Sequence, residues 1–143
     1  MNELTATDIH ELTSLYSEYS WAFDSGRGAD CAALFTDDGI FRNGENPPIE
    51  GRPDLEAFFV RAAGNGTRHQ VSNIRLSGTE GEHAHGAAYV LVLRTEEDKL
   101  RLVTMGEYHD TFARIDGAWK IEERRVAPTL SERLAGAVLA ESC

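Results

Sequence analysis

The chain has 143 residues, of which 41% are hydrophobic, and a formal net charge of -10. This length suits one domain with its own core and is short for two. The acidic balance argues against binding to nucleic acid or to an anionic membrane surface, because neutralising phosphates requires a basic face. The longest apolar run, from Tyr89 to Leu93, is too short to span a bilayer, and the N-terminus lacks a signal pattern. We therefore expect a single cytoplasmic domain.

Cysteine usage agrees with that expectation. The chain contains only Cys31 and Cys143, and their positions do not form the paired spacing of a disulfide scaffold or a zinc site. We expect both to be free thiols in a reducing compartment.

The first predicted element is an amphipathic helix over residues 8–24. Asp24 falls in its last turn, where the helix macrodipole disfavours a carboxylate unless a cation or a hydrogen-bond donor compensates. A histidine from elsewhere in the chain would be such a partner. The apolar residues that recur at helical spacing, and that we expect to form one buried stripe, are Ile9, Leu12, Tyr16, Tyr19 and Phe23.

The following segments predict two more helices and then a series of strands. Residues 30–35 form a short helix, Ile40 begins a short strand, and a third helix runs from Pro53 to Gly64. Strands are expected over 68–76, 84–94, 100–115 and 118–126, and Pro128 is expected to end the last one. Ser131 could cap a small C-terminal helix. This order indicates an α+β domain whose helices cover one face of a curved sheet and leave a cone-shaped pocket.

Three stretches, in this order, resemble the SnoaL-like branch of the nuclear-transport-factor-2-like superfamily. They are Tyr16–Asp24, His69–Asn73, and Gly106–Asp110 followed by Asp116–Arg124. The resemblance implies a cone-shaped α+β barrel, in which a curved and mostly antiparallel sheet is covered by three helices. It also implies one domain over residues 1–143, with a core at 8–126 and a C-terminal helical tail at 128–143.

Within that superfamily the chain is most similar to a group that includes scytalone dehydratase, bile-acid 7α-dehydratase and hexachlorocyclohexane dehydrochlorinase. These are cofactor-free lyases with a histidine–aspartate dyad. Carried over by position, His69 matches the general base and Asp24 the carboxylate that orients it. Tyr19 matches a tyrosine of the bile-acid dehydratase, where the dehydrochlorinase has lysine. A phenol can donate a hydrogen bond to a carbonyl or hydroxyl oxygen, which favours oxygen chemistry.

The three residues also fit the chemistry of proton abstraction beside a carbonyl. That step needs a base and a donor for the developing enolate oxygen, roles suited to His69 and Tyr19. Asp24 would fix the tautomer of His69 and make it a stronger base. Each residue has a simpler alternative: a structural histidine on a strand, a core tyrosine, and an aspartate that caps the turn at Gly26.

Four further residues are predicted to bind substrate. Tyr108 falls where the dehydrochlorinase has a pocket phenylalanine, Trp21 belongs to the first matching stretch, and Asn73 is expected to share a strand face with His69. Tyr108 could equally be core, and Asn73 a structural residue near a turn.

The fourth, Arg124, matches an arginine of the dehydrochlorinase pocket. Strict alternation from Trp119 and Ile121 would instead turn Arg125 towards the apolar face, unless a β-bulge intervenes.

Metal and cofactor signals are weak. His83 and His85 alternate and could share a face, but without a nearby third ligand a solvated hairpin is the more frequent outcome. The sequence has neither a glycine-rich phosphate loop nor a serine nucleophile elbow. We predict no cofactor, no metal and no covalent intermediate.

The leading functional hypothesis is a cofactor-free lyase of the dehydratase type that acts on a small hydrophobic cyclic hydroxy-carbonyl compound. One alternative is an isomerase or polyketide-type cyclase that uses the same base. Another is a non-catalytic ligand-binding protein or an oxygenase β-type subunit. The family precedent and an uncovered sheet face suggest a homodimer or homotrimer.

Overall fold

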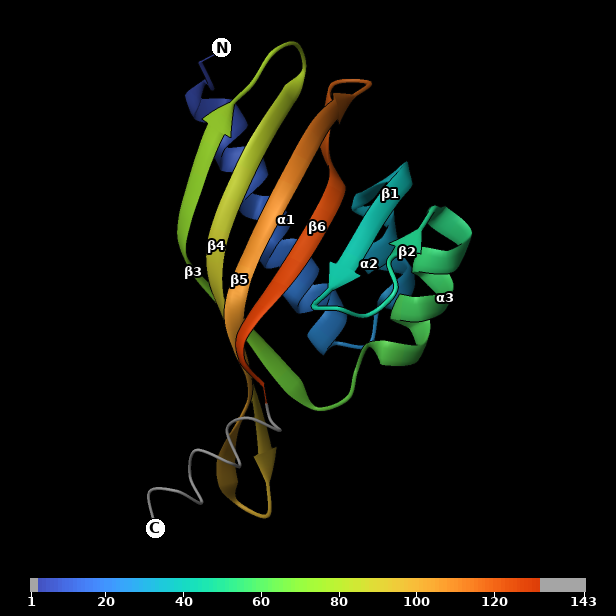
Figure 1. Cartoon of the computed structure of the whole chain (residues 1–143), viewed down its shortest axis with the longest axis vertical. Coiled ribbons are helices and arrows are strands. Elements are labelled where there is room, and N and C mark those ends of the chain that lie inside the picture. The colour runs from blue at the N-terminus through green and yellow to red at the C-terminus, as the bar shows by residue number, and fades with distance from the viewer. Residues whose placement is uncertain (1–2, 132–143) are drawn as a thin grey trace.

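The computed structural model describes residues 3–131 and contains three helices and six strands (Figure 1). The helical tail predicted for residues 128–143 is wrong for residues 128–131, which belong to a strand, and the rest of it lies outside the described part. Among the described residues, no helix is both long and apolar enough to cross a bilayer. In chain order the elements are α1 (Ala6–Asp24), α2 (Gly28–Ala33), β1 (Phe35–Asn43), β2 (Ile49–Glu50), α3 (Arg52–Ala62), β3 (Thr67–Gly78), β4 (His83–Glu96), β5 (Lys99–Ile115) and β6 (Ala118–Ser131).

The strands form a single curved sheet in the order β2-β1-β6-β5-β4-β3. All neighbours are antiparallel except β1 and β6, which run parallel. Figure 1 shows α1 crossing behind the long strands, with α3 beside the short strands β1 and β2. The predicted α+β class, with a mostly antiparallel sheet and three helices, is confirmed. The face of the sheet that α1 covers is called the inner face, and the opposite one the outer face.

Helix α1 is fixed at its start by a capping box. The Thr5 hydroxyl accepts a hydrogen bond from the Asp8 backbone N–H, and the Asp8 carboxylate accepts one from the Thr5 backbone N–H. Asp8 also accepts a hydrogen bond from the indole of Trp119 and pairs with Arg114. These contacts turn Asp8 inward, so Ile9 is 46% exposed and the prediction that it joins the buried stripe is wrong.

Strand β6 extends beyond its predicted end. Pro128 does not end it, because the strand continues to Ser131. Pro128 lies opposite Gly106, where the register of β5 and β6 shifts. Such an irregularity tolerates a residue that lacks a backbone donor. Gly106 permits the close approach, since a Cβ there would lie 2.6 Å from the Ala127 carbonyl oxygen.

The core lies between α1, α3 and the inner face of the sheet, and it is rich in aromatic rings. Phe59 of α3 packs against the rings of Phe35, Phe41 and Tyr19, with centroid separations of 5.3 to 5.8 Å. Cys31 is buried and is a free thiol, as predicted, and Cys143 lies outside the described residues.

Candidate active site

His69 and Asp24 form a tight pair at the C-terminal end of α1. One Asp24 oxygen accepts a hydrogen bond from the His69 backbone N–H at 2.8 Å, and the other lies 2.7 Å from His69 Nδ1. Each side chain is only 9% exposed. Because the carboxylate holds both the backbone and the ring, it fixes the orientation of the imidazole.

Two glycines bring these segments together. Gly26, just after α1, and Gly64, just before β3, both have positive φ angles, of 76° and 75°. The Gly64 N–H donates to the Phe23 carbonyl oxygen at 2.8 Å, which ties the chain before β3 to the last turn of α1. A Cβ on Gly64 would lie 2.9 Å from the Gly26 Cα. This close approach delivers His69 to Asp24.

Burial decides the protonation state of His69. Desolvation of the ring lowers its pKa below the usual value, and the nearby Arg124 charge acts in the same direction. Asp24 opposes this through its hydrogen bond and its charge, so it acts in the predicted direction but is outweighed. A neutral ring with its proton on Nδ1, facing Asp24, presents a free electron pair on Nε2.

Tyr19 lies beside the dyad. Its ring meets the His69 ring edge to face at a centroid distance of 6.3 Å, and the side chain is 2% exposed. Burial raises the Tyr19 pKa well above its usual value, with a smaller contribution from Tyr108. The phenol therefore stays protonated across the physiological pH range and keeps the proton that it needs to donate a hydrogen bond.

Arg124 is fully buried in the interior. Residues 122 and 123 form a bulge where the register of β6 against β5 shifts, and this bulge turns Arg124 inward and leaves Arg125 exposed. The guanidinium carbon lies 4.1 Å from the ring centroid of Tyr108, 4.5 Å from that of Tyr19 and 5.1 Å from that of Tyr16. The orientation implied by the resemblance, rather than by strict alternation, is the one found.

Asp110 is the interior residue that our sequence reasoning missed. Both of its oxygens accept hydrogen bonds from Arg124, each at 2.9 Å, and neither side chain is exposed. Burial opposes the charge of Arg124, but Asp110 outweighs it and raises the Arg124 pKa. Arg124 Nη1 has no hydrogen-bond partner among the described residues. The signal was present, since Tyr108, Asp110 and Phe112 alternate and place a carboxylate on an apolar face.

Trp21 and Tyr108, two of the predicted substrate contacts, differ sharply in exposure. Tyr108 is 2% exposed and points into the interior, whereas Trp21 is 71% exposed. Trp21 lines a surface hollow of about 290 Å³ that also includes Ser20, Asp24, Arg68 and His69.

Asn73 is not brought to the dyad. Its φ of 56° marks an irregularity in β3, where the pairing with β4 shifts between Ser72 and Arg75. The inward positions change from Val71 to Ile74 across this point, so Asn73 is exposed and does not share a face with His69. The expectation assumed strict alternation, which the bulge breaks.

One of the two predicted hairpin histidines has an ordinary partner. His83 lies 3.2 Å from a Glu122 oxygen at the surface. Within residues 3–131, no group of three or more histidine, cysteine or acidic side chains could hold a metal ion.

Comparison with known proteins assigns the class. Residues 4–125 match the SnoaL-like domain family, so the chain belongs to this family. A search of curated proteins finds no match.

Solved structures share the fold. One neighbour is a "Putative Scytalone Dehydratase" from Novosphingobium aromaticivorans, with 25% identity over 87% of this chain and 85% of that one, and a TM-score of 0.76. ActVI-ORFA from Streptomyces coelicolor has 25% identity over 85% of this chain and 96% of that one, with a TM-score of 0.77. The beta subunit of "a putative aromatic-ring-hydroxylating dioxygenase" from N. aromaticivorans has 19% identity over 91% of this chain and 97% of that one, with a TM-score of 0.73.

Proposed function

We propose that the protein is a cofactor-free lyase of the dehydratase type, with His69 as the base, Asp24 as its orienting carboxylate and Tyr19 as the donor to the substrate oxygen. The observation that carries the proposal is the two-point hold of Asp24 on a nearly buried His69 whose pKa is lowered. Such a ring is neutral at physiological pH and offers Nε2 as a base. The similarity to the "Putative Scytalone Dehydratase" supports the reaction class.

The proposed reaction balances without any co-reactant. His69 Nε2 takes a proton from the carbon beside the substrate carbonyl, and the electron pair moves to the carbonyl oxygen, where Tyr19 donates a hydrogen bond. The enolate then re-forms the carbonyl, a carbon–carbon double bond forms, and the β-hydroxyl leaves. The leaving group takes the proton from the His69 imidazolium and departs as water, which restores the neutral base.

The surroundings of the dyad suit a hydrophobic cyclic substrate. The Phe23 ring lies 4.8 Å from the His69 ring, and the buried rings of Tyr19 and Phe59 continue this aromatic cluster inward. Arg124 Nη1 offers a further donor that its partner Asp110 does not use. An isomerase or cyclase would share the first proton transfer and differ only in where the proton or the new bond is placed.

The test is a dehydration assay on scytalone and simpler cyclic β-hydroxyketones, followed by mass spectrometry and by the absorbance of the conjugated product. We expect His69→Asn to lower kcat by about 10²- to 10⁴-fold, since it removes the base. His10→Asn, which changes an exposed histidine on α1, should leave kcat unchanged. Full activity in His69→Asn would overturn the proposal.

A non-catalytic role as an oxygenase β-type subunit is the second candidate. The observation that favours it is the dense interior behind the dyad, where Tyr19, Tyr108 and Arg124 are each at most 2% exposed. The fold shared with a dioxygenase beta subunit agrees with it. This candidate predicts that a catalytic subunit co-purifies with the tagged chain, that the purified protein dehydrates none of the test compounds, and that His69→Asn has no effect on the complex.

A further inference from the structure

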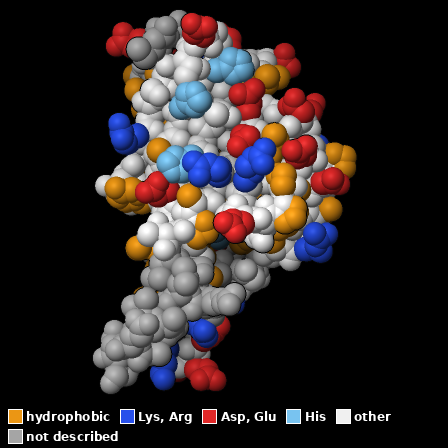
Figure 2. Space-filling model, viewed as in Figure 1, with side chains coloured by type: hydrophobic (Ala, Val, Ile, Leu, Met, Phe, Trp, Pro, Cys, Tyr) orange, Lys and Arg blue, Asp and Glu red, His pale blue; other side chains and the backbone are white. Residues whose placement is uncertain are grey.

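The outer face of the sheet carries a second hollow, separate from the dyad and facing away from α1. Its volume is about 400 Å³, within the range of small-molecule sites, and it spans β3, β4, β5 and β6. In Figure 2, blue and pale-blue side chains gather over the middle of this face.

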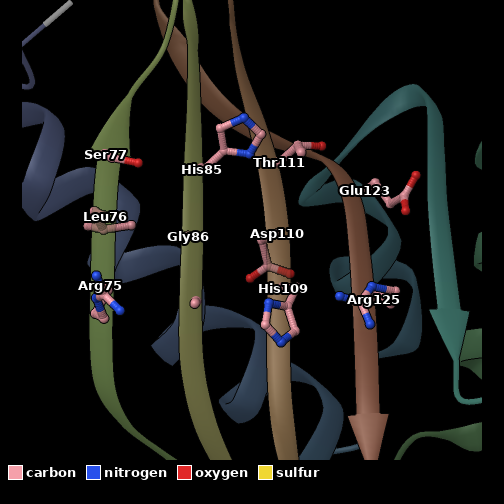
Figure 3. A pocket seen from close by; sticks show the side chains of 11 residues that line it. Arg75, Leu76, Ser77, His85, Gly86, His109, Asp110, Thr111, Glu123 and Arg125 are labelled. Carbon is pink, nitrogen blue, oxygen red and sulfur yellow. The ribbon is translucent and has the colours of Figure 1, made fainter. Parts of the chain in front are cut away.

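Strand pairing places the basic side chains of the hollow in one row. Arg75 of β3 pairs with Ala87 of β4, Ala87 pairs with His109 of β5, and His109 pairs with Arg125 of β6. Figure 3 shows Arg75, His109 and Arg125 at one level across the sheet. Paired residues on neighbouring strands point to the same face, so this row is a property of the register and not of one rotamer.

A second row lies beside the first and adds hydrogen-bonding groups. Ser77 pairs with His85, His85 pairs with Thr111, and Thr111 pairs with Glu123. Figure 3 shows these four side chains at the next level of the strands. Two hydroxyls and an imidazole can donate hydrogen bonds to an anionic group held by the first row.

Between the two arginines the first row contains the small Ala87 and the half-buried His109, and beside Ala87 the floor is bare backbone at Gly86. The Cβ that Gly86 lacks would point to the inner face, against Tyr16 and Phe112, so only backbone faces outward there. Ala87 contributes a methyl group. A flat molecule could lie on this part of the floor, with the His109 ring beside it.

The nearby acidic groups pair with residues other than the two arginines. Glu123 pairs with Arg42 at 3.0 Å, Glu107 contacts His109 at 2.8 Å, and Asp110 is turned inward to Arg124. Within residues 3–131, neither Arg75 nor Arg125 has an ion-pair or hydrogen-bond partner. In a chain with a net charge of -10, two uncompensated arginines in one hollow indicate an anionic occupant.

We propose that this outer hollow binds an elongated dianion, a small flat molecule with a carboxylate or phosphate at each end. Arg75 and Arg125 stand three strands apart, about 14 Å between backbones at a spacing of about 4.8 Å per strand. Their long side chains can reach towards each other from both ends of the floor, where each guanidinium matches one planar anion. A ligand with a single anionic end would engage only one of them.

The experiment is calorimetric titration of the full chain with terephthalate, a benzene ring with carboxylates at opposite ends. Benzoate, which has only one of the two carboxylates, and terephthalamide, which has neither charge, are the matched control ligands. We expect Arg75→Gln and Arg125→Gln each to weaken terephthalate binding about tenfold, as loss of a charge-assisted hydrogen bond does, and the double variant to abolish it. Arg61→Gln, an exposed arginine on α3, makes the same charge change outside the hollow and should leave binding unchanged.

Three results would overturn the proposal: no terephthalate binding, equal binding of benzoate, or full binding by the double variant. Sedimentation of the same variants tests another occupant. If the double substitution changes the oligomeric state and terephthalate does not bind, the hollow is covered by a second copy of the chain instead. Because His69 takes no part, His69→Asn should bind terephthalate like the unmodified chain, whichever way the dehydratase test falls.

Discussion

Arg124 and Arg125 are consecutive residues of β6 that occupy opposite faces of one sheet. Arg124 has no exposed surface, is held by both oxygens of Asp110, and is surrounded by three tyrosine rings. Arg125 is exposed, and within residues 3–131 it has no ion-pair partner. The same type of side chain is therefore part of the interior at residue 124 and is accessible to solutes at residue 125.

The difference extends to the residues paired with them on β5. Asp110 faces inward beside Arg124, whereas His109 faces outward beside Arg125. Charges on the inner face are compensated within the fold, because an uncompensated buried charge would be costly. Charges on the outer face are solvated by water and need no partner within the fold, so they remain available to bind a ligand. Substitutions on the two faces should therefore differ sharply in their effect on stability.

The largest difference should come from removing one partner of the buried pair. We expect Asp110→Ala to lower the free energy of unfolding by about 3–5 kcal/mol, because it leaves the Arg124 charge buried without a counter-charge. Arg125→Ala on the outer face should change it by less than about 0.5 kcal/mol. Urea unfolding followed by circular dichroism measures both.

A double substitution sharpens this result. Asp110→Leu combined with Arg124→Met removes both charges and keeps apolar volume, so much of the lost stability should return. If the double variant were no more stable than Asp110→Ala, the loss would come from packing and not from the unpaired charge.

The next largest difference concerns neighbouring residues of β4. A Cβ on Gly86 would overlap the Tyr16 hydroxyl and lie 2.8 Å from the Phe112 ring. We expect Gly86→Ala to cost about 1–3 kcal/mol through overpacking of the inner face. Ala87→Ser, one residue along on the outer face, is the matched control and should have little effect. Equal destabilisation by the two would mean that strand propensity, and not inner-face crowding, sets the cost.

The sequence was sufficient to predict the fold and the residues of the dyad. It was not sufficient to predict which face of the sheet each strand residue occupies. Apolar periodicity and turn residues predicted three helices and the long antiparallel strands, since these signals are local. Asn73 was assigned to the wrong face, and Arg124 could be assigned only by resemblance. In both cases a bulge, which depends on the partner strand, shifts the alternation.

Contacts between distant elements were the other limit. Asp110 is recognisable as a partner of Arg124 only once β5 and β6 are in register. Ile9 looked apolar and correctly spaced, yet Asp8 takes the inward position because Trp119, more than 100 residues later, offers it a hydrogen bond. The dyad roles of His69 and Asp24, although the two residues do meet, stay a prediction until the assay is done.

A pH dependence of stability should separate the buried dyad from the outer face. The folded-state pKa of His69 lies below its unfolded value of about 6.5, so the unfolded chain binds more protons between the two. The stability that this group contributes is present above pH 6.5 and is lost as the pH falls through the folded pKa. Urea midpoints measured from pH 7.5 to pH 5 should fall less steeply for His69→Asn than for the unmodified chain. Parallel profiles would show that His69 is not the group responsible.

The smallest effect should come from an ion pair at the outer surface. Arg42 and Glu123 lie 3.0 Å apart across β1 and β6, with side chains 38% and 33% exposed. Because water and salt screen such a pair, we expect Arg42→Gln to cost only about 0.2–1 kcal/mol. That cost should shrink in 1 M salt, whereas the cost of Asp110→Ala should persist because its site excludes solvent. If Arg42→Gln lowered stability as much as Asp110→Ala, the two faces would not differ in how they support charge. Glu123, which would then lack its partner Arg42, lies in the same hollow as Arg125 and could pair with it instead.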